Sequence, residues 1–216
     1  MKSLKDIILE SLDDKNEEIK QIKDFIKKNY SRALNIKVSK EKNSDGKYIV
    51  TCTNDYVELS QDATAITDGT FVWGEIRGSF DCAMNDNIDT LYGAPVKVGG
   101  YFSCSECESL TSLEYAPKEV GTFTCSQCNS LKTLEGGPEI VHDSYSCSKC
   151  KSLISLKGSP KSVKYFRCDG CKSLKSLQGC PKDIDKIKCN DCGTQFTEKE
   201  IYKITNISNL TGEIIV

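Results

Sequence analysis

The sequence has few of the residues that carry most enzyme chemistry. Its 216 residues include one histidine and one tryptophan. It holds no nucleophile elbow, phosphate-binding loop, HExxH motif or paired acidic motif. The single histidine, His142, lies in a loop beside Asp143, where a lone imidazole is usually solvated. We therefore expect no catalytic residue, no cofactor and no small-molecule substrate.

The chain also lacks an excess of charge of one sign and lacks long apolar runs. Its 29 basic and 31 acidic residues give no net-charge argument for binding nucleic acid or a membrane surface. No stretch approaches the roughly 18 apolar residues of a membrane span. The N-terminal MKSLKDIILESLDD has early acids and a short apolar run, unlike a secretory signal. We expect a cytoplasmic protein with neither a membrane nor a nucleic acid as partner.

Cysteine is abundant, with 13 residues, although hydrophobic residues make up only 38% of the chain. A low apolar content suits an elongated protein with a thin core. Without an export signal, so many cysteines indicate a reducing compartment and free thiols.

Ten cysteines form five C-x-x-C pairs separated by 17 or 18 residues. The pairs are Cys104/Cys107, Cys125/Cys128, Cys147/Cys150, Cys168/Cys171 and Cys189/Cys192. Two such pairs at this separation are a recognised zinc-ribbon pattern. One hypothesis is therefore an array of zinc ribbons.

Aligning the segments on their cysteines reveals a repeat of 21 or 22 residues that includes much more than cysteine. The consensus is x-F-x-C-x-x-C-x-S-L-x-S-L-x-G-x-P-x-x-V, and all five prolines of the chain occupy its single proline column. An aromatic or aliphatic residue lies two positions before each first cysteine: Phe80, Phe102, Phe123, Tyr145, Phe166 and Ile187. The extra residue of the longer units always falls after the Val/Ile column, which is typical of a loop on a stacked solenoid.

This consensus resembles the leucine-rich repeat, whose period is about 20 to 29 residues. The resemblance covers residues 79–192, a little over half of the chain. Short units ending in "TSL-x-G-x-P" are also similar to the bacterial short-repeat class and to leucine-rich-repeat proteins of gut bacteriophages. In those, "LTSLEGAPKEVGG" runs recur, often behind a leader like MKSLKDIILESL. The resemblance implies an α/β solenoid with a parallel sheet on its concave face, located in an infected bacterial host or in the virion.

The first repeat distinguishes between zinc and a structural role for the cysteines. It reads Cys82-Ala-Met-Asn85, with asparagine where later repeats have the second cysteine. Zinc needs thiolate or imidazole at such a position, and five pairs would leave one without a partner. In the leucine-rich-repeat alignment, the second cysteine is instead a ladder position that satisfies backbone groups at the bend after each strand. We predict buried cysteines and no metal site.

Terminal repeats of a solenoid need caps because they would otherwise expose the core. We expect a helical leader or cap over residues 1–30, a β-rich cap and degenerate repeat over 31–78, repeats over 79–192 and a C-terminal cap over 193–216. Leu4, Ile8 and Leu12 would share a face of one helix, which could instead be a detachable tag. A second helix would open at Asp14-Lys-Asn-Glu17 and turn inward the residues Ile19, Ile22 and Ile26.

The remaining cap elements are predicted from alternation and capping signals. NIKVS and YIVTC indicate two strands around a Ser-Asp-Gly turn. Trp73 is predicted to be cap core. Thr197-x-x-Glu200 predicts a closing helix, followed by a strand at GEIIV.

Residues that flank the inward strand positions should line the concave sheet and contact a protein partner. They are Tyr101, Ser103, Ser105, Thr122, Thr124, Ser126, Ser146, Ser148, Tyr165, Arg167, Lys186 and Lys188, with Ser79, Asp81, Ala83, Ser144, Asp169 and Asn190 in equivalent places. Residues 54–120 carry twelve acids and three bases, whereas residues 159–190 carry eight bases and three acids.

The sequence leaves several interpretations of this surface open. It could be a Ser/Thr-lined trough whose basic end binds an acidic or extended protein. It could instead be a solvated face with hydroxyl ladders within the sheet. A structural or packaged virion component remains an alternative role.

Overall fold

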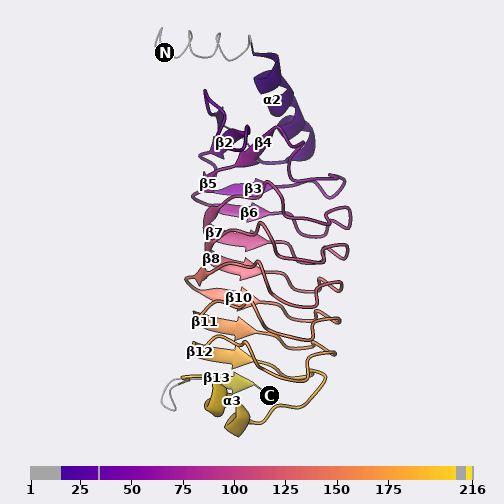
Figure 1. Cartoon of the computed structure of the whole chain (residues 1–216), viewed down its shortest axis with the longest axis vertical. Coiled ribbons are helices and arrows are strands. Elements are labelled where there is room, and N and C mark those ends of the chain that lie inside the picture. Colours follow the sequence, from indigo (N-terminus) through magenta and orange to yellow (C-terminus); the bar gives the residue numbers. More distant parts are fainter. Residues whose placement is uncertain (1–15, 34, 208–212, 216) are drawn as a thin grey trace.

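The protein is a β-solenoid in which each turn of the chain adds one strand to a mostly parallel sheet (Figure 1). The computed structural model describes residues 16–33, 35–207 and 213–215. The predicted helix carrying Leu4, Ile8 and Leu12 lies outside the described residues. The strand order in the main sheet is β3-β6-β7-β8-β10-β11-β12-β13. Consecutive turns of the sequence are therefore neighbours in space.

The main sheet follows the period of the repeat. Its strands are β3 (Tyr56–Glu58), β6 (Ser79–Asp81), β7 (Lys97–Ser103), β8 (Glu119–Thr124), β10 (Ser144–Ser146), β11 (Ser162–Arg167), β12 (Asp183–Lys188) and β13 (Glu213–Ile215). Two short strands, β5 (Glu75–Ile76) and β9 (Ile140–Val141), pair with β7 and β8. Phe102 is level with both Phe80 and Phe123, so each repeat column becomes a row across the sheet.

The core is a set of such rows packed inside the solenoid. Phe80 stacks on Phe102 with ring centroids 5.6 Å apart, and Phe102 stacks on Phe123 at 5.7 Å. The two leucine columns are almost completely buried. Each buried side chain of this size contributes about 1.5–3 kcal/mol to the free energy of folding. Because every repeat supplies the same buried positions, the core is continuous along the solenoid although the apolar content of the chain is low.

A left-handed residue shapes the bend in every turn. The residue before the second cysteine, or before Asn85, has φ between 55° and 74° in six successive turns. These residues are Met84, Glu106, Gln127, Lys149, Gly170 and Asp191. Only one is glycine, so five turns hold an L-residue in a conformation that L-residues rarely adopt. The bend turns the following side chain back into the core, where the second cysteines up to Cys171 and Asn85 are buried.

Helix α2 (Glu17–Asn29) and a three-stranded sheet lie at the N-terminal end (Figure 1). Asn16, rather than Asp14, is the N-cap, and its side chain accepts hydrogen bonds from the backbone of Glu18 and Ile19. Ile19, Ile22 and Ile26 are buried, as predicted. The sheet consists of β1 (Ile36–Val38), β2 (Tyr48–Cys52) and β4 (Phe71–Trp73).

Trp73 joins this end to the solenoid core. Its side chain is fully buried, and its indole Nε1 donates to the Tyr30 hydroxyl at 2.9 Å. Its ring also lies edge-on to Phe80, the first aromatic residue of the repeats, at 5.9 Å. The predicted core role of Trp73 is confirmed.

At the other end, helix α3 (Glu198–Ile204) begins with the predicted capping box. The Thr197 side chain accepts from the Glu200 backbone, and the Glu200 side chain accepts from the Thr197 backbone. The β13 strand pairs in parallel with β12, so it continues the main sheet by one strand.

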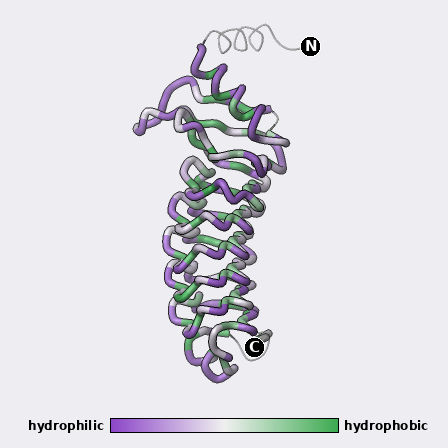
Figure 2. Tube along the Cα trace, turned by 90° about the vertical axis from the view of Figure 1, so that its right-hand side faces the viewer, coloured by the Kyte–Doolittle hydropathy of each residue, from purple (hydrophilic) through white to green (hydrophobic). Residues whose placement is uncertain are grey.

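The column of turns is nearly straight in two perpendicular views (Figures 1 and 2). The sheet is therefore flat along the solenoid axis, and it lacks the marked concavity that the leucine-rich-repeat resemblance implies. Within the described residues, no helix is long and apolar enough to cross a membrane.

Candidate binding face

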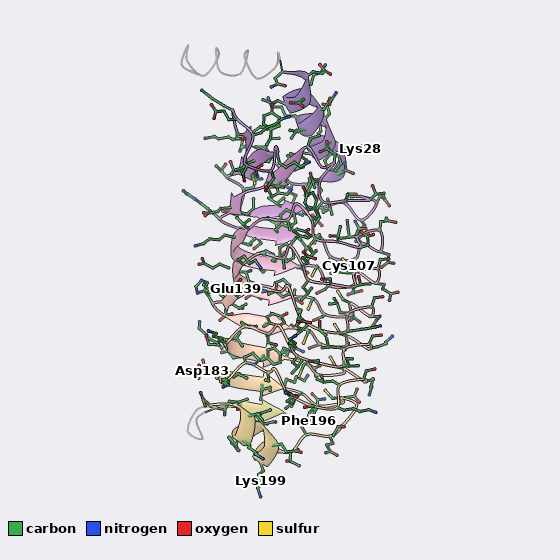
Figure 3. The ribbon with its side chains drawn as sticks, viewed as in Figure 1. Lys28, Cys107, Glu139, Asp183, Phe196 and Lys199 are labelled. Atoms are coloured by element: carbon green, nitrogen blue, oxygen red, sulfur yellow. The ribbon has the colours of Figure 1, made fainter. Side chains whose placement is uncertain are left out.

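The second cysteine of each pair forms a ladder of hydrogen bonds between turns. Each thiol donates to the carbonyl oxygen of the first cysteine in the preceding turn (Figure 3, in which Cys107 is labelled). The sulfur-to-oxygen distances are 3.2 Å for Cys107 to Cys82, 3.0 Å for Cys128 to Cys104, 3.1 Å for Cys150 to Cys125, 3.1 Å for Cys171 to Cys147 and 3.2 Å for Cys192 to Cys168.

Asn85 makes equivalent hydrogen bonds in the first repeat. Its amide nitrogen donates to the carbonyl oxygens of Ser60 and Ala63, at 3.0 and 2.9 Å, in the preceding turn. Asparagine and cysteine thus exchange at a position that requires a short, buried hydrogen-bond donor. The predicted ladder is confirmed.

Burial disfavours the thiolate of Cys107 and of the first-column thiol Cys82, whereas side-chain hydrogen bonds with Cys104 and Cys168 lower the pKa of Cys128 and Cys192. Loss of solvation raises the pKa of Cys107 to about 12 and that of Cys82 well above its usual range. A protonated, buried thiol is a poor nucleophile and a poor metal ligand. Among residues 16–33, 35–207 and 213–215, no three His, Cys, Asp or Glu side chains are grouped as metal ligands would be. The geometry therefore favours a hydrogen-bonded ladder over zinc ribbons.

Strands β3 to β12 present two rows of outward residues, which together we name the hydroxyl face. The inner row, in strand order, is Tyr56, Ser79, Tyr101, Thr122, Ser144, Tyr165 and Lys186. The outer row is Glu58, Asp81, Ser103, Thr124, Ser146, Arg167 and Lys188. All predicted partner-binding residues on these strands share this face.

Hydroxyl groups of the outer row are linked by short contacts to Ser105, Ser126 and Ser148, each of which lies two residues after an outer-row residue and borders the face. The oxygen-to-oxygen distances are 2.8 Å for Ser105 and Thr124, 3.3 Å for Thr124 and Ser126, 2.8 Å for Ser126 and Ser146, and 3.2 Å for Ser146 and Ser148. Ser148 then donates to Asp169 at 2.8 Å. The expected hydroxyl ladder is therefore present, and it ends on a carboxylate.

Asp169 connects this chain to the basic end of the face. It is 7% exposed, and its oxygens lie 3.5 Å from Arg167 Nε and 3.8 Å from Lys188 Nζ. The protein thus supplies part of the counter-charge that the clustered bases require. The Arg167 side chain remains half exposed.

Aromatic contact completes the basic end. Lys186 Nζ lies 5.6 Å from the centroid of the Tyr165 ring, within cation–π range. A hollow of about 250 Å³ opens between these side chains, Arg167 and Lys188. Such a place can accept a carboxylate or another anionic group, because Arg167 offers planar donors beside two ammonium groups.

The opposite end of the face is acidic, and of its residues Asp81 is among those predicted to line the sheet, whereas Tyr56 and Glu58 are not. Asp81 accepts hydrogen bonds from the hydroxyls of Tyr56 and Tyr101, at 2.9 and 3.4 Å. Glu58 forms an ion pair with Arg32 at 3.5 Å. Burial, reinforced by the bonds to Tyr101 and Asp81, raises the pKa of Tyr56. Tyr56 and Glu58 lie in the degenerate turn, whose sequence does not match the consensus.

The predicted binding residues differ in accessibility. Ser103 and Ser148 are buried, at 7% and 5% exposure, so they serve the sheet itself. Tyr165 and Arg167 are exposed, and the remaining predicted residues are partly exposed.

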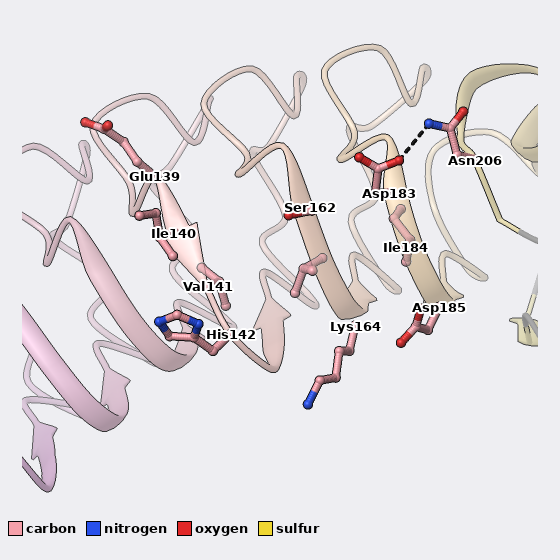
Figure 4. Close-up of a pocket in the computed structure, with 11 residues that line it drawn as sticks. Glu139, Ile140, Val141, His142, Ser162, Lys164, Asp183, Ile184, Asp185 and Asn206 are labelled. Carbon is pink, nitrogen blue, oxygen red and sulfur yellow. Dashed lines mark hydrogen bonds between the residues drawn. The ribbon is translucent and has the colours of Figure 1, made fainter.

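A second hollow of about 480 Å³ crosses three turns at another edge of the sheet (Figure 4). Several of its polar side chains are engaged with neighbours. Asp183 accepts from Asn206 at 2.7 Å, Lys164 pairs with Asp143 at 3.3 Å, and His142 lies 3.0 Å from Glu119. His142 is thus exposed and paired with a carboxylate in a ladder between turns.

Comparisons of the chain with protein-family models, with curated proteins and with solved structures found no match.

Proposed function

We propose that this chain is a non-enzymatic, protein-binding module of the leucine-rich-repeat type, and that it binds a protein partner through the hydroxyl face. The observation that carries the proposal is the basic end, where Arg167, Lys186 and Lys188 lie on two adjacent strands. Like charges placed this close repel one another, and Asp169 lies near Arg167 and Lys188. An acidic or extended partner would add counter-charge on the exposed side of this end.

The order of the face supports binding. Its hydroxyls are held by bonds to one another, so little side-chain entropy remains to be lost on association. The small hydroxyl side chains in the middle of the face would let an extended partner chain approach the sheet closely. The basic end would add electrostatic attraction.

The leucine-rich-repeat assignment rests on the consensus, with its aromatic, cysteine and leucine columns. The same resemblance supports a location in the cytoplasm of an infected bacterial host. A structural or packaged component of the virion is the alternative, which the opposite charges of the two ends would also permit.

Asp169 forms ion pairs with Arg167 and Lys188, and these ion pairs determine which variants can test the proposal. Changing Arg167 and Lys188 alone would leave a buried carboxylate without its cations and would lower stability as well as binding. We therefore combine Arg167→Gln and Lys188→Gln with Asp169→Asn, and use Asp169→Asn alone as the matched control. A partner isolated from the native host should bind the triple variant at least about tenfold more weakly than the control, and the difference should grow at low salt.

A second control tests the other side of the solenoid. Lys132→Gln with Lys175→Gln removes two exposed charges away from the hydroxyl face. Unchanged binding by the triple variant, with loss in this control, would move the site to the other side and overturn the proposal.

A further inference from the structure

The hydroxyl face is self-complementary in charge. Seven strands carry it, and β8 is the middle one, with three strands on either side. In the outer row, Thr124 on β8 has acidic residues at one end and basic residues at the other. Asp81 and Arg167 lie two strands from Thr124 in opposite directions, and Glu58 and Lys188 lie three strands away.

The inner row is complementary in size about the same strand. Tyr101 and Ser144 are equidistant from Thr122, one strand away on each side. Tyr165 and Ser79 are likewise two strands away on opposite sides. Each of these two large side chains therefore has a small hydroxyl residue as its counterpart.

A single symmetry operation brings all these counterparts together. A twofold axis parallel to the strands, placed above β8, turns one hydroxyl face onto another and reverses the order of the turns. Asp81 of one copy then faces Arg167 of the other, and Glu58 faces Lys188. In the inner row Tyr101 faces Ser144, Tyr165 faces Ser79, and Tyr56 faces Lys186. The arrangement needs a straight column, which both views show (Figures 1 and 2).

We propose that the hydroxyl face binds a second copy of this chain in an antiparallel, twofold-symmetric dimer. This inference rests on the proposed function, in that the same face is the protein-binding surface, and it names the partner. A parallel arrangement would bring the two acidic ends together and the two basic ends together, so charge selects the antiparallel one.

Three internal ion pairs moderate the attraction, and the Tyr56 and Tyr101 hydroxyls already donate to Asp81. Asp169 partly neutralises Arg167 and Lys188, and Arg32 pairs with Glu58. Asp81 against Arg167 is therefore the contact on which the dimer depends most. Strands about 4.8 Å apart give a face about 30 Å long. Two rows of residues then cover about 300 Å² per copy, well below the roughly 800 Å² per partner of a tight complex. The dimer is accordingly weak and sensitive to salt.

Sedimentation equilibrium of the full chain in reducing buffer, from about 1 to 200 µM, tests the dimer. All chains carry Asp169→Asn, which removes a competing carboxylate. Asp81→Arg and Arg167→Asp should each weaken self-association at least about tenfold, because the symmetry repeats the contact twice. An equimolar mixture should form a heterodimer about as tight as the parent, since both contacts then join opposite charges.

Matched charge reversals on other surfaces, Asp89→Arg and Lys175→Asp, should leave the dimer unchanged. Restoration on mixing also shows that both single variants are folded. A parent that stays monomeric, single variants that still dimerise, a mixture that stays monomeric, or species that grow beyond a dimer would each overturn the inference. A monomeric parent would leave the proposed function standing, because that is decided by binding of the separate host partner to the Arg167→Gln, Asp169→Asn, Lys188→Gln variant.

Discussion

The first repeat and the later repeats solve the same problem with different side chains. Asn85 donates to two carbonyl oxygens of the preceding turn, whereas Cys107 and its equivalents each donate to one. Their positions after a left-handed residue are the same. The second position of C-x-x-C therefore requires a short, buried hydrogen-bond donor, which either cysteine or asparagine provides.

The first cysteine of each pair differs from the second in what its thiol contacts. The Cys82 sulfur lies 3.2 Å from the Ser103 carbonyl oxygen, but that oxygen already accepts the Cys82 backbone N–H at 2.8 Å. The thiol bond is therefore redundant, and the first column is packing. The two cysteines of one motif should respond differently to the same substitution.

The largest effect should come from alkali. The folded state keeps Cys107 protonated up to a pKa of about 12, whereas an unfolded thiol releases its proton near 8.5. The contribution of this thiol to the free energy of unfolding is therefore fully present below about pH 8 and is lost as the pH rises towards 12. At about pH 10 the loss is about 2 kcal/mol for each such thiol.

At high pH, the combined loss from several buried thiols would equal most of the roughly 5–15 kcal/mol by which a domain is stable. Thermal melts with reductant should show a steep fall in melting temperature between about pH 8 and 10. The Cys107→Asn variant, with one thiol fewer, should fall less. A melting temperature that is constant to about pH 10 would contradict burial of the thiols.

Within one motif, Cys125→Asn should be far more harmful than Cys128→Asn. Cys125 belongs to the packing column, so an amide there lacks partners and costs about 2–4 kcal/mol. At Cys128 the amide can donate to the Cys104 carbonyl oxygen of the preceding turn, as Asn85 donates to the Ser60 carbonyl oxygen of the turn before it. Urea unfolding of both variants gives the two free energies, and equal losses would remove the distinction between the columns.

Removing the donor in the first repeat should have a moderate effect. Asn85→Ala leaves the Ser60 and Ala63 carbonyl oxygens without this partner and should cost about 1–3 kcal/mol. Asn85→Cys restores one donor and should cost less than alanine. If alanine is tolerated as well as cysteine in urea unfolding, hydrogen bonding is not what the position requires.

The smallest difference should separate Cys128→Ala from Cys128→Asn. Alanine loses one thiol hydrogen bond and part of a buried side chain, whereas asparagine keeps a donor but is larger. We expect asparagine to be the more stable by about 1 kcal/mol. Differential scanning calorimetry can resolve this, and the reverse order would indicate that volume outweighs hydrogen bonding at the second position.

The sequence predicted the features that repeat. The period places Phe102 level with Phe123, and Asn85 among the cysteines identifies the ladder. What it missed depends on contacts between turns. Asp169 was seen only as one of several flanking residues, because its burial between Arg167 and Lys188 arises from stacking.

Tyr56 and Glu58 at the acidic end, and the straightness of the column, were not predicted, for related reasons. Tyr56 and Glu58 occupy a turn that departs from the consensus, so their alignment with Asp81 appears only in the strand register. Curvature depends on the relative widths of the two sides of a solenoid, which a list of aligned columns does not give.

The thiols of the C-x-x-C pairs are held by carbonyl oxygens of the preceding turn, so we expect the pairs to form a hydrogen-bonded core without zinc. Elemental analysis of the protein purified from cytosol under reducing conditions, followed by circular dichroism before and after chelator, tests this expectation. We predict far less than one zinc per chain and a fold that chelation does not change. Zinc near two per chain, lost together with the fold on chelation, would contradict the claim.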